Sequence, residues 1–126
     1  MTADTIFDTV LTLMFAEVEE KSEYENQFIS ALNLVLAETF EVNNSILAAN
    51  GEEELTGIPE VTSLSDEMAY DAALCRRVLP YGVAGLIMAE DNAGMAVQYK
   101  NKYEYEKTQS MKAAYTEIID HYAEEE

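Results

Sequence analysis

Hydrophobic residues recur at helical spacing along most of the 126-residue chain, and this pattern predicts four helical segments. The first covers residues 4–20, and its apolar positions are Phe7, Val10, Leu11, Met14 and Val18. The second begins with the capping-box residues Ser22 and Glu25, an S-x-x-E pair that satisfies backbone donors at a helix start. Asn50-Gly51 ends it, because this pair favours the left-handed conformation that stops a helix.

The second segment carries a stripe of apolar positions wide enough to be covered on two sides. Its members are Phe28, Ile29, Leu32, Val35, Leu36, Thr39, Phe40, Val42, Ile46 and Leu47. At a rise of about 1.5 Å per residue, this helix would be about 40 Å long. We therefore expect it to be the long central helix of the fold.

The helical pattern breaks in residues 51–65, GEEELTGIPEVTSLS, where glycine and proline stand among polar residues. This stretch predicts an irregular loop or a short hairpin, and loops of this length are often functional. A third helical segment is expected to begin near Asp66, because Asp66 and Glu67 would place negative charge in its first turn. Pro80 then either kinks this segment or lies in the first turn of a separate helix that follows Leu79.

Residues 78–89, VLPYGVAGLIMA, carry no charge and are too few to span a bilayer. Gly82 and Gly85 lie three residues apart, so they share a helix face and allow another backbone to come close. We expect the second helix to cross this face. A tight connection at residues 90–94 leads to a last helix that ends near Tyr122.

These elements predict an all-α fold: a small helical bundle with a long central helix and a third segment broken by proline. Residues 1–126 are expected to form a single helical domain, with residues 1–3 and 124–126 frayed. The opening residues MTADTIFDTV lack the basic leader of a secretory signal.

The net charge of −18 is unevenly distributed. Residues 1–75 hold sixteen acids and one base, whereas residues 76–126 hold nine acids and six bases. Nucleic-acid binding needs lysine and arginine to replace counterions, so this surface repels nucleic acid. It also keeps the protein soluble through self-repulsion.

The residues that commonly carry chemistry are few. His121, the one histidine, lies four residues after Glu117, whereas a di-metal carboxylate site needs two Glu-x-x-His motifs. Cys75 is alone, which excludes an internal disulfide, fits a reducing compartment and favours a small core residue. We expect no metal, no cofactor and no enzymatic activity.

Tyrosines and lysines alternate at the start of the last helix. They are Tyr99, Lys100, Lys102, Tyr103, Tyr105 and Lys107. A basic, aromatic surface can serve as a nucleic-acid platform, but the net charge argues against that use. We instead expect the lysines to pair with acids of neighbouring helices or subunits, and the tyrosines to lie at an interface.

The sequence LPYGVAGLIMAEDNAGMAVQYKNKYEYE, residues 79–106, resembles the C-terminal half of head–tail connector proteins of tailed bacteriophages and prophages, also called adaptor, neck or head-completion proteins. The residues that carry the resemblance are Leu79, Pro80, Tyr81, Gly82, Ala84, Glu90, Asp91, Ala96, Tyr99, Tyr103 and Glu104. Thr62, Ser63, Leu64, Asp66 and Glu67 match a segment that often leads into this helix. The resemblance covers about half of the chain. The N-terminal TIFDTVLTLMFAEVEE departs from the acidic opening helix of the commonest branch, so the branch stays open.

The resemblance implies a helical structural protein without catalysis or cofactor. Such proteins form a ring of about twelve subunits under the portal, extend the DNA channel and receive downstream neck or tail proteins. An isolated subunit can be monomeric, and DNA passes through without specific binding. The implied location is the bacterial host cytoplasm during assembly and then the virion neck, with no membrane contact.

Two groups of residues follow as expectations. Leu79, Pro80, Tyr81, Gly82, Gly85, Asp66 and Glu67 would be scaffold residues. Lys100, Lys102, Lys107, Tyr99 and Tyr103 would be subunit contacts.

Two other functions stay open, a small acidic mimic of DNA and a helical module that binds some other protein. A DNA mimic needs carboxylates spaced regularly like phosphates. The acids at 17, 19, 20, 23 and 25 are followed by a gap to Glu38, which is irregular.

Overall fold

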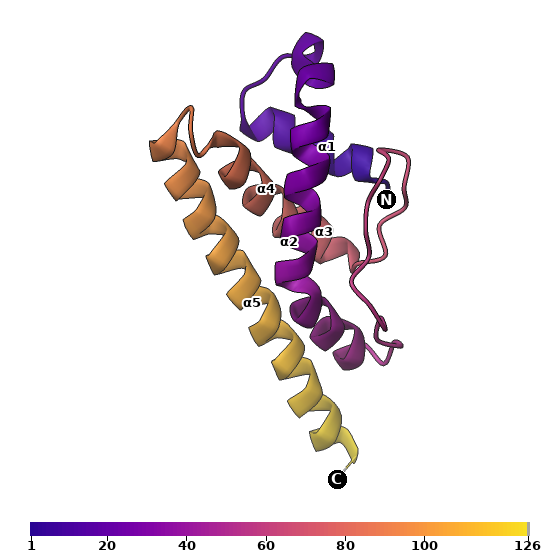
Figure 1. Cartoon of the computed structure of the whole chain (residues 1–126). Coiled ribbons are helices and arrows are strands. Elements are labelled where there is room, and N and C mark those ends of the chain that lie inside the picture. The colour runs from indigo at the N-terminus through magenta and orange to yellow at the C-terminus, as the bar shows by residue number, and fades with distance from the viewer. Residues whose placement is uncertain (126) are drawn as a thin grey trace.

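The computed structural model describes residues 1–125, and the side chains of residues 1–115 (Figure 1). Its helices are α1 (Ala3–Leu13), α2 (Lys21–Ala49), α3 (Ala72–Arg77), α4 (Leu79–Met88) and α5 (Ala93–Glu125), with a short 3₁₀ turn at Val18–Glu20. The predicted all-α class is confirmed. The two long helices, α2 and α5, flank α4, and α1 crosses on the far side of α2 (Figure 1). The Glu117–His121 pair and the expected fraying at 124–126 lie outside the described side chains.

Helix α1 ends at Leu13, so the prediction of a first helix to residue 20 is wrong. Phe15 adopts a left-handed φ of 57°. Its N–H donates to Thr12 O, and the Ala16 N–H donates to Leu11 O at 3.0 Å, which together close the helix end. Glycine usually fills the left-handed position of this motif, so no sequence signal marked the stop. Val18, predicted to be apolar core, is 84% exposed.

Helix α2 begins at Lys21 without a side-chain cap, so the predicted capping box at Ser22 and Glu25 does not start it. Lys21 instead forms ion pairs with Asp4 at 2.7 Å and Asp8 at 2.9 Å, which join the start of α2 to α1. The predicted end is confirmed, because Asn50 is the C-cap and Gly51 has a φ of 77°. The buried residues of α2 are Phe28, Ala31, Leu32, Val35, Leu36, Thr39, Asn43, Ile46 and Leu47, which confirms most of the predicted stripe.

The segment between α2 and α3 is irregular, as predicted, but it extends to residue 71. In the part of the chain that the structure describes, its β character is limited to an isolated bridge between Thr2 and Glu67, so the hairpin alternative is wrong. The third helical segment begins at Ala72 rather than near Asp66. The carboxylate of Asp71 caps α3 by accepting hydrogen bonds from the backbone N–H groups of residues 73 and 74.

Asp66 stabilises a turn of this segment instead of a helix. Its carboxylate accepts hydrogen bonds from the N–H groups of Thr62 at 2.9 Å and Ser63 at 3.1 Å, and these bonds lower the pKa of Asp66. Short acidic side chains favour such local turns, which compete with a helix start.

Residues 1–3 are held by this same segment, so the expectation that they are frayed is wrong. The Ala3 N–H donates to Asp66 O, and the Met68 N–H donates to Met1 O, both at 2.9 Å. The side chain of Ala3 is fully buried.

Three asparagines of α2 bind the backbone of the segment. The Asn33 amide both donates to Val61 O and accepts from the Val61 N–H, and the Asn44 amide makes the same pair of bonds with Leu55. Asn43 accepts from the Asp71 N–H at 2.8 Å. These bonds give an irregular segment the partners that a buried backbone requires.

At Pro80 the chain forms two helices rather than one kinked helix. Helix α3 ends at Arg77, Val78 lies between the helices, and Pro80 occupies the first turn of α4. A tight connection follows α4, as predicted. The Asn92 side chain accepts from the Met95 N–H at the start of α5.

Candidate interaction surface

Gly82 and Gly85 allow α5 to lie close against α4. A Cβ added at Gly82 would lie 2.8 Å from the Tyr103 ring and 3.2 Å from Val35. A Cβ at Gly85 would lie 3.4 Å from Ala96 O and 3.6 Å from the Lys100 backbone nitrogen. The predicted close approach is therefore confirmed, but α5, and not α2, brings its backbone to Gly85.

Leu79 and Pro80, two of the predicted scaffold residues, are buried. Asp66 and Glu67 are not brought to the same place. They lie in the segment on the side of α2 that faces away from α5 (Figure 1).

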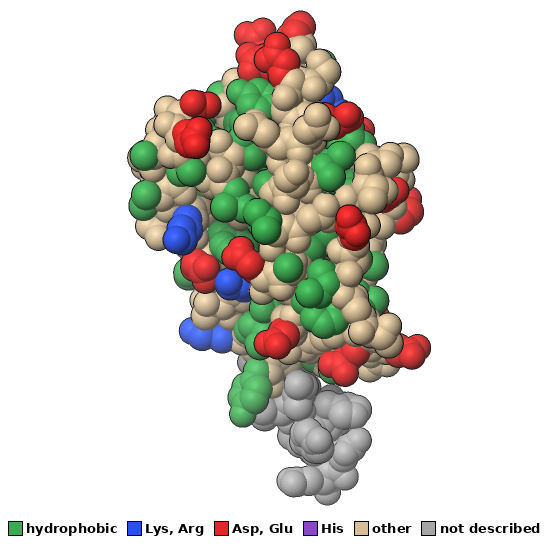
Figure 2. Space-filling view, viewed as in Figure 1, with side chains coloured by type: hydrophobic (Ala, Val, Ile, Leu, Met, Phe, Trp, Pro, Cys, Tyr) green, Lys and Arg blue, Asp and Glu red, His purple; other side chains and the backbone are tan. Residues whose placement is uncertain are grey.

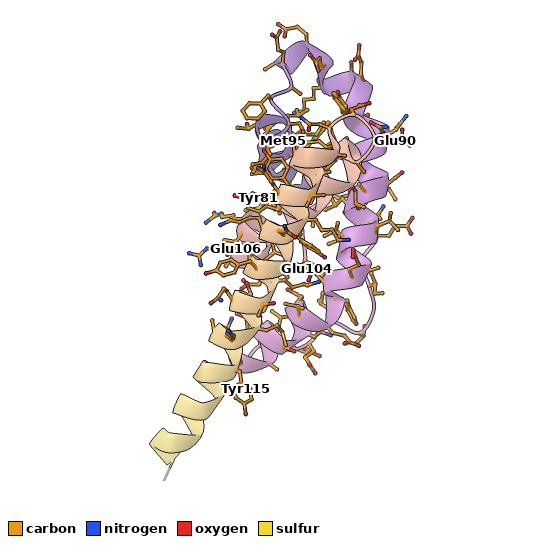
Figure 3. The ribbon with its side chains drawn as sticks, turned by 90° about the vertical axis from the view of Figure 1, so that its left-hand side faces the viewer. Tyr81, Glu90, Met95, Glu104, Glu106 and Tyr115 are labelled. Carbon is orange, nitrogen blue, oxygen red and sulfur yellow. The ribbon has the colours of Figure 1, made fainter. Side chains whose placement is uncertain are left out.

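Tyr99 ties α5 to the end of α1. Its hydroxyl donates to Leu13 O at 2.6 Å, which gives a partner to one of the carbonyls left open at the helix end. The Tyr81 ring lies 5.9 Å from the Tyr99 ring, and the Lys102 ammonium lies 5.9 Å from the centre of the Tyr81 ring. In Figure 3, Tyr81, Met95 and Glu106 lie on the side of α5 away from α2.

Two of the three candidate contact lysines have partners in their own helix. Lys102 pairs with Glu106 at 3.1 Å, and Lys107 pairs with Glu104 at 3.2 Å. Lys100 is exposed and has no ion pair within the described residues.

A groove lies between α2 and α5, with α4 as its floor. It has a volume of about 390 Å³, and a second hollow of about 560 Å³ continues it along α2 and shares Leu86 and Ala89 with it. The floor comes from Gly82, Gly85 and Leu86 of α4 and from Ala89, which follows its last residue. We call these two adjoining hollows together the α2–α4–α5 groove.

Hydrophobic side chains in the groove are open to solvent. The exposed fractions are 61% for Leu34, 45% for Leu86 and 58% for Val97. Figure 2 shows hydrophobic side chains gathered between α5 and α2, with acidic side chains above and below them. The acids that line the groove are Glu38, Glu90, Asp91 and Glu104, and its one base is Lys100.

Tyr103 lines the groove with a buried hydroxyl that lacks a partner. The side chain is 4% exposed, and its hydroxyl oxygen makes no hydrogen bond. Burial raises the pKa of Tyr103, and the charges of Glu38 and Glu104 raise it further. The groove therefore contains an unsatisfied polar group beside carboxylates, in an otherwise apolar setting.

Outside the groove, the described residues provide few groups suited to binding a metal or to catalysis. Among residues 1–115, no three His, Cys, Asp or Glu side chains are placed to hold a metal ion. Burial raises the pKa of the Cys75 thiol to about 11, which fits the predicted small core residue rather than a reactive thiol. No helix among the described residues is long and apolar enough to cross a membrane.

Comparisons with known proteins add no relative. No protein-family model matches the chain, and neither a curated protein nor a solved structure does.

The sequence predicted Gly82 and Gly85 as scaffold residues and Tyr103 as a subunit contact, but it did not predict the groove. The Tyr103 side chain is instead 4% exposed and packs against Gly82 within the chain. The hydrogen bonds of Asn33 and Asn44 to the backbone of residues 61 and 55, which we call the asparagine clamp, were also missed. So was the exposure of Leu34, Leu86 and Val97. Asparagine inside an apolar helix was the available signal for the clamp, because it disfavours helix interiors unless its amide has a use.

Proposed function

We propose that this chain is a structural subunit of a head–tail connector of a tailed bacteriophage or prophage. It would dock under the portal as part of a ring and extend the DNA channel. The observation that carries the proposal is that residues 79–106, which resemble connector proteins, form one packed unit. In it Gly82 contacts Tyr103, and Tyr81 lies beside Tyr99, so residues of the resemblance contact one another.

The surface charge supports a channel function. Twenty-five acids against seven bases would give the channel wall a negative potential. Phosphates would be repelled rather than bound, so DNA would slide through without specific contacts.

Ring formation requires two different surface patches on each subunit, because the subunits pack head to tail. The lysines of α5 supply one patch, since ion pairs at the surface such as Lys102–Glu106 are weak, and the half-exposed Lys102 can exchange its partner for an acid of a neighbour. The tip between α1 and α2 supplies the other, because exposed Phe15 and Val18 stand there with Glu17, Glu19 and Glu20.

The test is assembly on a portal protein, taken from the genome that encodes this chain. Portal rings mixed with the chain are expected to show an added ring of density by negative-stain electron microscopy. The double variant Lys102→Glu with Lys107→Glu should fold but fail to add this density. The matched control, Arg76→Glu with Arg77→Glu, makes the same change in charge on α3 and should assemble.

Unchanged portal rings with the wild-type chain would contradict the proposal. Normal assembly of the α5 lysine variant would contradict the subunit contact but not the connector function.

A further inference from the structure

Two helices present rows of side chains to the α2–α4–α5 groove. The α2 stripe has a spacing of four residues and comprises Asn26, Ser30, Leu34 and Glu38. The α5 wall comprises Ala93, Ala96, Val97, Lys100, Tyr103 and Glu104. From residue 26 to residue 38, α2 rises about 18 Å, which is the length of about three turns of a helix. A hollow of this shape between two helices is suited to a third helix laid along it.

The floor of the groove is small and apolar, and its edges are apolar and exposed. The small side chains of Ala89, Ala93 and Ala96 line the hollow, while Leu34, Leu86 and Val97 remain open to water. An occupant with a row of large hydrophobic side chains would cover this surface and gain their burial.

The charges at the groove select a basic occupant. Glu90 and Asp91 lie at one end and Glu38 and Glu104 at the other, against Lys100 alone. Glu104 already shares its carboxylate with Lys107, whereas Glu38 has no ion pair within the described residues. In Figure 3, Glu90 lies on the α2 side of α5, which is the side of the groove.

The Tyr103 hydroxyl adds a specific contact. It is buried without a hydrogen bond in a residue that lines the groove together with Glu38 and Glu104, so a ligand reaches it once a neighbouring side chain moves aside. A phenol oxygen accepts a hydrogen bond as well as donating one, so a lysine or arginine head group could bind it together with the Glu38 carboxylate.

We propose that the α2–α4–α5 groove binds a basic amphipathic helix of another protein, about three turns long. Its hydrophobic face covers Leu34, Leu86 and Val97, and a lysine or arginine near one end binds Glu38 and the Tyr103 hydroxyl. A second copy of this chain is the poorer occupant. The exposed apolar tip at Phe15 and Val18 carries Glu17, Glu19 and Glu20, which would meet the acids of the groove. The inference does not depend on the connector proposal.

The test uses three synthetic peptides of about 18 residues. The first has leucines on one helical face and lysines on the other, the second replaces every lysine with glutamate, and the third scrambles the first. Binding to the full chain is measured by isothermal titration calorimetry. We expect the first peptide to bind at least about tenfold more tightly than the other two, and to bind more weakly as salt is raised.

Variants of the groove separate a specific site from general attraction to an acidic protein. Leu86→Glu and Val97→Glu each add a negative charge, so they would strengthen a non-specific attraction, but they place that charge on the hydrophobic surface. We expect each variant to bind the first peptide at least about tenfold more weakly than the wild type does. Ile58→Glu is the matched control, because Ile58 is an exposed apolar residue outside the groove and should leave binding unchanged.

Two milder variants test the polar end of the groove. Tyr103→Phe removes a hydroxyl that has no partner in the free protein, so it should not lower the stability of the fold. It should nevertheless weaken peptide binding about three- to tenfold. Glu38→Gln should weaken binding and reduce its salt dependence, whereas Glu41→Gln, one turn away and outside the groove, should do neither.

Three results would overturn the proposal. The first is equal binding of the lysine, glutamate and scrambled peptides, or no binding at all. The second is full binding by Leu86→Glu and Val97→Glu. The third is self-association in sedimentation velocity that Leu86→Glu abolishes, which would make a second copy the occupant.

Discussion

The two sides of α2 differ in what covers them. On one side the segment of residues 51–71 lies against the helix, and Asn33 and Asn44 give its backbone paired hydrogen bonds. On the other side α4 and α5 leave a groove in which Leu34 is exposed and the Tyr103 hydroxyl has no partner. One side is closed by polar contacts within the chain, and the other is left for a partner.

This difference between the two sides of α2 shows what a buried segment of irregular backbone requires. The covering segment has no helix of its own to pair its N–H and C=O groups, so side-chain amides must do so. Helices α4 and α5 satisfy their own backbone, and their surface between the long helices is mostly glycine, alanine and leucine. That side therefore requires no further contact within the chain, although the buried Tyr103 hydroxyl there has no hydrogen-bond partner among the described residues.

The largest effect should come from removing the asparagine clamp. The double variant Asn33→Ala with Asn44→Ala loses four hydrogen bonds and leaves the backbone of Leu55 and Val61 without protein partners. We expect the free energy of unfolding in urea to fall by about 2–4 kcal/mol. Hydrogen exchange at the Leu55 and Val61 amides should become faster.

Asn26→Ala is the control on the other side of the same helix. Asn26 lies at the groove, is exposed, and makes no hydrogen bond through its side chain within the described part of the chain. The free energy of unfolding of this variant should therefore stay within about 0.5 kcal/mol of the wild type. Equal effects of the two variants would show that the two sides of α2 do not differ in the way described.

The second-largest effect should come from alkaline pH, which should lower the stability of the fold by removing protons from buried groups. The Tyr70 hydroxyl donates to Leu36 O at 2.5 Å, and burial raises the pKa of Tyr70 to about 12 and that of Cys75 to about 11. The unfolded chain loses these protons at lower pH than the folded chain does. Stability is therefore unaffected by these groups below about pH 9 and falls as the pH rises through 11 and 12.

The expected loss is about 1–3 kcal/mol for each group, measured from urea midpoints at pH 8 and at pH 11–12. Absorbance at 295 nm should show tyrosines that ionise late, and Tyr70→Phe should remove part of this late phase and flatten the decline in stability. Tyr105→Phe replaces an exposed tyrosine and should leave the decline unchanged. A decline that Tyr70→Phe does not alter would contradict this account.

What the sequence predicted well is local. The stripe of α2, its end at Asn50 and Gly51, and the glycine face of α4 follow from spacing within one helix and from the conformations that each residue favours. What it missed depends on contacts between distant residues. Asp66 was placed at a helix start because acids favour that position, but it binds the backbone of Thr62 and Ser63 and holds residue 3.

The candidate surface was predicted in part for the same reason. Gly82 and Gly85 were expected to be scaffold residues and Tyr103 a subunit contact, but the buried Tyr103 ring packs against Gly82 within the chain. The exposure of Leu34 and Val97 could not be foreseen, because a helical pattern does not say which apolar positions find a covering helix. Lys102 and Lys107 were expected to pair with acids of neighbouring helices or subunits, and within the chain they pair with acids one turn away in α5 itself.

The smallest effects should come from the floor of the groove, where two glycines of one face make a matched pair. At Gly82 an added methyl group would lie 2.8 and 2.9 Å from the buried Tyr103 ring, so the ring or the helix must move. Alanine favours helix over glycine by about 1 kcal/mol, but crowding in a packed contact costs about 1–3 kcal/mol. Gly82→Ala should therefore lower the free energy of unfolding in urea by about 1–2 kcal/mol.

At Gly85 the nearest atom would be 3.4 Å away, an ordinary contact. The preference of alanine for helix then decides the sign of the change in stability. Gly85→Ala should be as stable as the wild type or more stable, by up to about 1 kcal/mol. If Gly82→Ala is also neutral, the Tyr103 ring moves freely and its hydroxyl is not fixed in the groove. If Gly85→Ala is the more destabilising of the two, α5 lies closer to α4 at Gly85 than at Gly82. Opposite signs at two positions three residues apart would establish that the open side of α2 has a tightly packed floor beneath an uncovered surface.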